Sequence, residues 1–150
     1  MKHPPETAKL EAILRSSKLT AFGFMGDDVR PPAEIIESDA AELAKLNYTV
    51  YDIADRMREI TVKARAGLGT SVRIGENLEA TASATRGQVP CPWPHAGRFP
   101  KTVVTLRRTD GDRYIRWSEL SIHLIEAHGF FEGKGAPFRL SPRELVGMLF

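Results

Sequence analysis

The segment 119–128 carries the residues best suited to acid–base chemistry. If it forms a helix, Glu119, His123 and Glu126 fall within a stripe of about 60° on one face. Two carboxylates and an imidazole on one face can share a proton or bind a metal ion, although such a stripe is more often the solvated side of an amphipathic helix. His123 and Glu126 are therefore candidate catalytic residues.

A proline-rich segment at residues 87–101 presents the next candidates. It contains four prolines, two aromatic residues, Cys91 and His95. The alternating prolines restrict the backbone toward an extended form, which would present Trp93 and His95 rigidly to a ligand. The alternative is a loop that its aromatic residues pin to the core. His95 is a candidate for both ligand binding and acid–base catalysis.

The sequence predicts no metal site. Cys91 and His95 have the spacing of a metal-ligand pair, but no second pair of the usual spacing accompanies them. His123 and His128 lie five positions apart, or about 140° around a helix, so one regular helix face cannot present both to an ion. His128 is expected among apolar residues or as a histidine at the helix C-terminus.

A basic and aromatic surface is predicted near the turn Asp110-Gly111. Arg107, Tyr114 and Arg116 fall on the side of their hairpin that should point away from the core. Arginines beside an aromatic residue on an exposed sheet can bind phosphates and stack a base. The alternative is a solvated face on which arginine stems cover apolar surface. The candidate ligand-binding residues are Trp93, His95, Arg107, Tyr114 and Arg116.

Two β-hairpins must position these residues, at about 70–86 and 102–117. In the first, small or apolar residues alternate with polar ones around Gly75-Glu76-Asn77. In the second, Asp110-Gly111 is the favoured sequence of a type I′ turn. The residue pairs expected on its core side are Leu106 with Ile115 and Val104 with Trp117.

Helices are predicted on both sides of the hairpins. They cover residues 6–18, two segments within 39–66, residues 119–128, and a last segment that begins at Ser141. Thr49 followed by Asp52 resembles a capping box and divides the second stretch into two helices. The apolar run Leu19–Met25 allows a further strand. Three phenylalanines among the glycines of residues 129–138 predict a sharply turning, anchored loop.

The fold class that follows is α+β, in a single domain of residues 1–150. An antiparallel sheet built from two hairpins packs against N-terminal and C-terminal helices. The composition is that of a globular protein, with 42% hydrophobic and 27% charged residues, and the lone cysteine excludes an internal disulfide. No leader or membrane-spanning stretch stands out, so we expect a cytoplasmic location and no membrane partner.

Three functions remain open at this point. The first is a small binding or accessory protein that holds an anionic ligand, a nucleotide or nucleic acid, because residues 61–150 carry 13 basic and 8 acidic side chains. The second is a small hydrolase or lyase with a histidine–carboxylate or metal site. The third is a homodimer that pairs through its apolar helical stripe. No particular cofactor is indicated.

Overall fold

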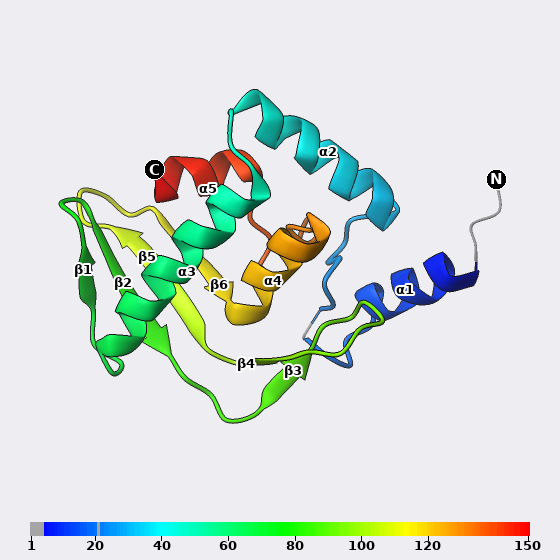
Figure 1. The fold of residues 1–150 in the computed structure, drawn as a ribbon, viewed down its shortest axis with the longest axis horizontal. Helices are drawn as coiled ribbons and strands as arrows, with labels where there is room; N and C mark the ends of the chain where they lie inside the picture. The colour runs from blue at the N-terminus through cyan, green and yellow to red at the C-terminus, as the bar shows by residue number, and fades with distance from the viewer. Residues whose placement is uncertain (1–4, 21) are drawn as a thin grey trace.

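Five helices and two antiparallel sheets make up residues 5–20 and 22–150, the part of the chain that this computed structural model describes (Figure 1). The elements are α1 (Pro5–Arg15), α2 (Pro32–Lys45), α3 (Val50–Ala66), β1 (Val72–Ile74), β2 (Leu78–Ser83), β3 (Gln88–Pro90), β4 (Arg98–Pro100), β5 (Val103–Arg108), β6 (Tyr114–Ser118), α4 (Glu119–His128) and α5 (Pro142–Leu149). One sheet has the strand order β1-β2-β5-β6, and the other pairs β3 with β4. The predicted α+β class is confirmed.

The register of the second hairpin is the predicted one. Leu106 pairs with Ile115 and Val104 pairs with Trp117, and all four side chains are buried. Trp117 is fully buried, and its indole N–H donates a hydrogen bond of 3.0 Å to the Thr61 hydroxyl of α3. The apolar side of the sheet therefore faces the helices, as the period-two pattern requires.

The turn of that hairpin differs from the prediction. A type I′ turn needs positive φ at both central residues, and neither Asp110 nor Gly111 has it. Instead the Arg108 N–H donates to the Arg113 carbonyl at 2.9 Å, so four residues form the loop. In this loop the Arg108 guanidinium binds the Asp110 carboxylate at 2.9 and 3.0 Å.

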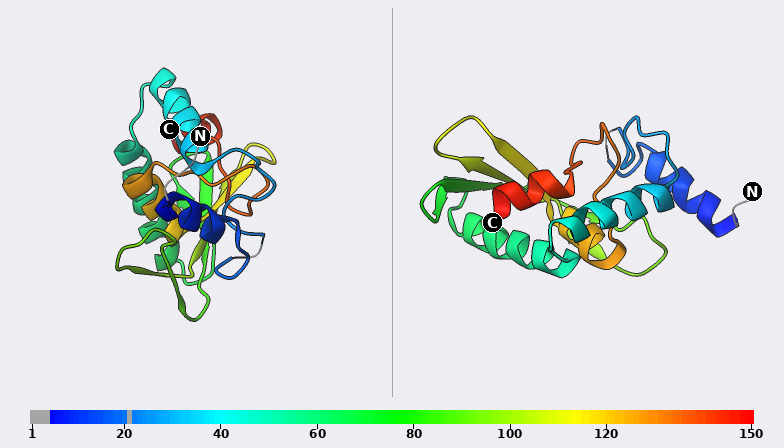
Figure 2. Two further views of the ribbon diagram at one scale, coloured as in Figure 1. Left: turned by 90° about the vertical axis from the view of Figure 1, so that its right-hand side faces the viewer. Right: turned by 90° about the horizontal axis from the view of Figure 1, so that it is seen from above.

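Helices α3 and α5 cover the apolar face of the four-stranded sheet (Figure 2). Ala80 and Ala82 of β2 supply small side chains on that face, which lets α3 approach the strands closely. The opposite face carries half-buried and exposed side chains. Helix α4 lies between two groups of buried residues, because Ile122 and Ile125 belong to the sheet core while Leu120 and Leu124 pack with a second group formed largely by the N-terminal segment.

The helix ends follow the predicted capping residues. Thr49 and Asp52 form the reciprocal capping box at the start of α3, and the Ser141 hydroxyl caps α5. Helix α2 begins at Pro32, well before the predicted limit of residue 39, because a proline at the first helical position fits the helix without losing a hydrogen bond. No helix in the described ranges is long and apolar enough to cross a membrane.

The expected strand at Leu19–Met25 is absent from the described part of that run. Phe22, Gly23 and Gly26 have positive φ, which bends the chain into consecutive turns. This segment then interlocks with the loop after α4, since the Gly133 N–H donates to the Phe24 carbonyl at 2.9 Å. The loop after α4 is anchored as predicted, with Phe130 and Phe131 buried.

Replacing Gly26 by alanine should destabilise the protein strongly. A β-carbon at Gly26 would run into backbone atoms of Lys134, Gly135 and Ala136, which cannot move aside. We expect Gly26→Ala to lower the free energy of unfolding by about 3 kcal/mol, from left-handed strain plus overpacking.

Gly75→Ala is the matched control for this substitution. Gly75 has φ +69°, close to the +57° of Gly26, but nothing lies within 4 Å of an added β-carbon. It should therefore cost only the strain of about 1 kcal/mol. Urea unfolding of both variants measures the difference, and equal losses would contradict the interlocked loops.

Candidate metal centre

Four side chains that can bind a metal ion meet beside α4. Cys91 and His95 come from the proline-rich segment that joins β3 to β4, while His123 and His128 come from α4. The thiol sulfur and one ring nitrogen of each histidine all lie within 4.8 Å of one another. In the described part of the chain, no other cluster of histidine, cysteine and acidic side chains is of this kind.

The distances between these atoms match the edges of a tetrahedron around a zinc ion. His95 Nε2 lies 3.1 Å from His123 Nε2 and 3.3 Å from His128 Nε2, and Cys91 Sγ lies 3.4 Å from His128 Nε2. Tetrahedral zinc with Zn–N bonds of about 2.05 Å and a Zn–S bond of about 2.3 Å spaces its nitrogens about 3.3 Å apart and its sulfur about 3.5 Å from each nitrogen. Three of the tetrahedron's edges therefore have the required length, and the other pairs of ligand atoms lie within 4.8 Å.

Aromatic side chains of the proline-rich segment orient the two histidines of α4. Trp93 stacks on His128 with ring centroids 4.1 Å apart and an interplanar angle of 8°. Phe99 stacks on His123 with centroids 4.4 Å apart. Each ring is thus held by packing before any ion arrives, which is what a preorganised site requires.

The prediction that His123 and His128 cannot converge is wrong. Their ring centroids lie 5.2 Å apart, and His95 reaches in from outside the helix to contact both. The two side chains leave the helix about 140° apart, but both rings contact His95, which comes from another segment and lies against each of them. The premise that Cys91 and His95 lack a second pair is also wrong, because His123 and His128 supply it.

The protonation states of the histidines suit metal binding. Burial, followed by the neighbouring histidines, lowers the pKa of His128 to about 4, and burial lowers the pKa of His123. Both imidazoles are therefore neutral at pH 7 and have a lone pair to offer. His95 Nδ1 lies 2.8 Å from the Ala96 carbonyl, which can only accept, so the proton sits on Nδ1 and the Nε2 lone pair faces the cluster.

Cys91 is the buried member of the cluster. Only 6% of its surface is exposed, and burial raises the pKa of its thiol despite a hydrogen bond from the Trp93 backbone. A neutral, buried thiol is a poor nucleophile. A divalent ion held here would reverse this situation, because Cys91 would lose its proton to solvent and serve as a thiolate ligand.

The predicted anion-binding residues are divided between two places. Trp93 and His95 contact α4, whereas Arg107, Tyr114 and Arg116 lie on the exposed face of β5 and β6. Figure 1 shows the β5–β6 turn and the β3–β4 loop at opposite ends of the molecule. Trp93 and His95 therefore do not lie beside the three candidates on the sheet. Anion binding by the exposed face stays a prediction.

The carboxylates of the predicted acid–base stripe face arginines of α3. Glu126 pairs with Arg58 at 3.1 Å, and Glu119 pairs with Arg65 at 3.4 Å. The stripe is thus the side of α4 that lies beside α3, and His123 turns toward the histidine cluster instead. Catalysis by His95, His123 or Glu126 stays a prediction, as does the homodimer.

Two members of the cluster, Cys91 and His128, are not among the site residues predicted from the sequence. The signal that could have found them is the pairing of two short motifs, Cys91-x3-His95 and His123-x4-His128, in separate segments. Neither motif is specific alone, and only the packing of the loop against α4 joins them.

Comparisons with known proteins yield no relative. The chain matches no protein-family model, no curated protein and no solved structure. A function can therefore be inferred only from the geometry and chemistry of the site.

Proposed function

We propose that this is a zinc-binding protein, in which Cys91, His95, His123 and His128 hold one Zn²⁺. The observation that supports it most is the set of ligand-atom distances of 3.1, 3.3 and 3.4 Å. Pairwise hydrogen bonds account for these contacts less well than one ion does, because His95 Nε2, with its ring proton on Nδ1, has a single lone pair and faces two other Nε2 atoms at once.

The chemistry of the ligands selects the metal. One thiolate and three imidazoles suit Zn²⁺, whereas Mg²⁺ and Ca²⁺ require oxygen ligands. Four protein ligands close the tetrahedron and leave no position for a substrate, which is the pattern of a structural site. The ion would clip the proline-rich segment to α4 and so order a loop that has few backbone hydrogen bonds of its own.

Metal analysis of the purified protein tests this proposal. The protein should be produced without a polyhistidine tag. Its zinc content is then measured by elemental mass spectrometry, and we expect one zinc ion per chain. Replacing the zinc by Co²⁺ should give the intense visible bands of a tetrahedral site and a thiolate charge-transfer band. An octahedral Co²⁺ spectrum, or a protein that stays metal-free when zinc is supplied, would refute the proposal.

Ligand variants sharpen the test. His128→Ala should weaken zinc binding at least a hundredfold, since removal even of groups that only support a ligand costs 10- to 100-fold. Cys91→Ser should also abolish the charge-transfer band of the Co²⁺ protein. Glu126→Gln is the control, because Glu126 lies on the same helix but pairs with Arg58, and its zinc content should be unchanged.

A further inference from the structure

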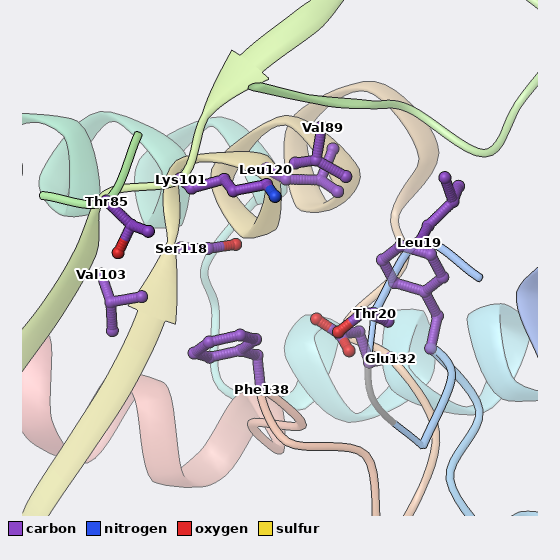
Figure 3. Close-up of a pocket in the computed structure, with 11 residues that line it drawn as sticks. Leu19, Thr20, Thr85, Val89, Lys101, Val103, Ser118, Leu120, Glu132 and Phe138 are labelled. Atoms are coloured by element: carbon purple, nitrogen blue, oxygen red, sulfur yellow. The ribbon is translucent and has the colours of Figure 1, made fainter. Parts of the chain in front are cut away.

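A cavity lies apart from the four metal-binding side chains, between the N-terminal turns, the sheet and the loop after α4 (Figure 3). It has a volume of about 270 Å³. Its walls are largely apolar and are formed by Phe24, Val89, Val103, Leu120 and Phe138. One acidic side chain, Glu132, also lines it.

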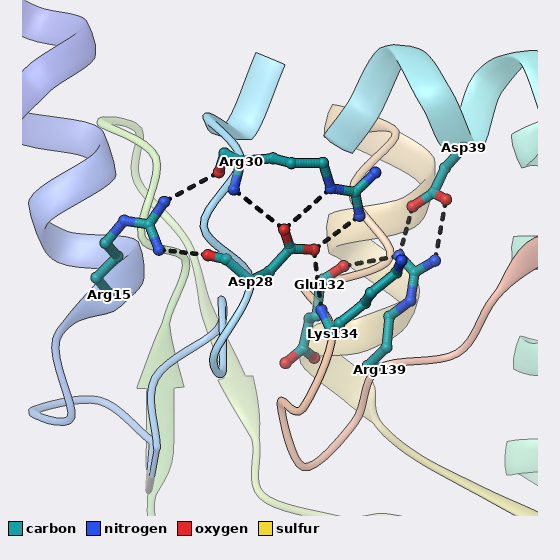
Figure 4. A network of polar contacts seen from close by, with 7 residues as sticks. All are labelled: Arg15, Asp28, Arg30, Asp39, Glu132, Lys134 and Arg139. Carbon is teal, nitrogen blue, oxygen red and sulfur yellow. Dashed lines mark hydrogen bonds and ion pairs between the residues drawn. The ribbon is translucent and has the colours of Figure 1, made fainter. Parts of the chain in front are cut away.

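Glu132 is an unusual residue to find there. Its side chain is 3% exposed, and its backbone has φ +68°, a conformation that favours glycine. In the described part of the chain, no hydrogen bond from a protein group reaches its carboxyl oxygens, and no dashed line joins them to the other residues drawn in Figure 4. Burial raises the pKa of this carboxyl to about 8, so at pH 7 it is mostly protonated and has an O–H to donate.

A polar network holds the backbone around Glu132 but makes no contact with its carboxyl group (Figure 4). Arg139 donates to the Glu132 carbonyl at 2.8 Å and binds both carboxylate oxygens of Asp39. The neighbouring Lys134 N–H donates to the Asp28 carboxylate at 3.1 Å. The charge of the Arg139 guanidinium is thus already neutralised by Asp39. The Glu132 carboxyl, which lines the cavity, can therefore bind a ligand there.

We propose that this cavity binds a small, mostly apolar molecule through a hydrogen bond from the Glu132 carboxyl to a neutral acceptor, such as a carbonyl oxygen. An unpartnered polar group at an otherwise apolar surface is the usual way in which a pocket fixes the orientation of its ligand. Since a cavity of about 150 Å³ holds benzene, the cavity here accommodates roughly ten non-hydrogen atoms.

The charges around the cavity disfavour a cationic ligand. Lys101, between β4 and β5, is the other titratable residue among those lining it, and Arg139 contributes the nearest further charge. The lining residues of the N-terminal turns, β5 and α4 are apolar or carry hydroxyls. An ammonium group would therefore meet positive charge at Lys101 and gain nothing from Glu132 until the carboxyl ionises.

A matched pair of probes tests the ligand class. We would titrate 4-phenylbutan-2-one, a ketone of suitable size, and 3-phenylpropylamine, its cationic counterpart, into the ¹⁵N-labelled protein at pH 6.5. The ketone should shift amide signals of Phe24, Leu120 and Glu132, with a dissociation constant of about 1 mM or tighter. No shift at these residues, or tighter binding of the amine, would overturn the proposal.

Variants of Glu132 test the donor itself. Ketone binding to the natural protein should weaken as the pH rises through about 8, because the O–H is lost. Glu132→Gln keeps a donor at every pH, so it should bind within about threefold at pH 6.5 and lose the pH dependence, while Glu132→Leu should bind at least tenfold more weakly. Unchanged binding by a folded Glu132→Leu variant would show that Glu132 is not the anchor. These readouts need no bound zinc, so they stand apart from the test of the metal centre.

Discussion

Removing zinc from the loaded protein should lower its melting temperature by about 10 °C. Zinc supplied at about a thousand times its dissociation constant stabilises the folded state by about 4 kcal/mol, if the unfolded chain binds it weakly. For a chain of this size each kcal/mol corresponds to roughly 2–4 °C. The unfolded chain should bind zinc weakly because the ligands come from segments far apart in sequence, Cys91 and His95 on one side and His123 and His128 on the other.

Calorimetry with and without excess EDTA measures this effect. The Cys91→Ser variant is the control, because it should melt at the same temperature in both conditions and close to the zinc-free natural protein. Glu126→Gln should respond to EDTA as the natural protein does. A melting temperature that EDTA leaves unchanged in a protein shown to contain zinc would mean that the ion does not hold the loop.

Local rules predict much of this fold from the sequence. The capping box at Thr49 and the alternation that puts Val104 opposite Trp117 depend on neighbouring residues alone, and both are confirmed. The predicted type I′ turn at Asp110-Gly111 is wrong, and the four-residue loop found there contains an ion pair between Arg108 and Asp110 that the dipeptide rule does not consider. The run at 19–25 misleads because Phe22 and Gly23 have positive φ, and Gly26, just after the run, packs against a loop more than a hundred residues away.

The candidate site was harder to predict because it depends on contacts between distant segments. His95 and His123 are recognisable as chemically useful residues, but their partners are not. The pair His123 and His128 becomes useful only when a loop brings Cys91 and His95 over the end of α4, and Trp93 and Phe99 hold it there. No spacing rule within one segment contains that information.

The same holds for Glu132, whose sequence neighbours suggest only an aromatic and glycine-rich turn. Its burial comes from the interlocking of this turn with residues 24–28, and its lack of a partner comes from Asp39 holding Arg139. A charged residue in a polar loop is ordinarily solvated. Here tertiary structure removes most of the water around the carboxyl, and no described residue supplies a hydrogen bond in its place.

Replacing Glu132 by glutamine should therefore stabilise the protein at alkaline pH. The carboxyl has a pKa of about 8 when folded and 4.5 as a free side chain, so between these values the folded state holds a proton that the unfolded state has released. Stability contributed by the protonated carboxyl is complete below pH 4.5 and is lost as the pH rises to 8. The loss amounts to about 4 kcal/mol at pH 8.5, and a glutamine of the same shape does not incur it.

Urea unfolding from pH 5 to 8.5 measures this difference. The gap between Glu132→Gln and the natural protein should widen steadily with pH, while the exposed Glu37→Gln should stay within about 0.5 kcal/mol of the natural protein throughout. A gap that does not change with pH would contradict a buried, protonated Glu132. Proteins commonly keep such a costly group where activity requires it, and binding of an acceptor in the adjoining cavity gives this chain a reason to keep Glu132.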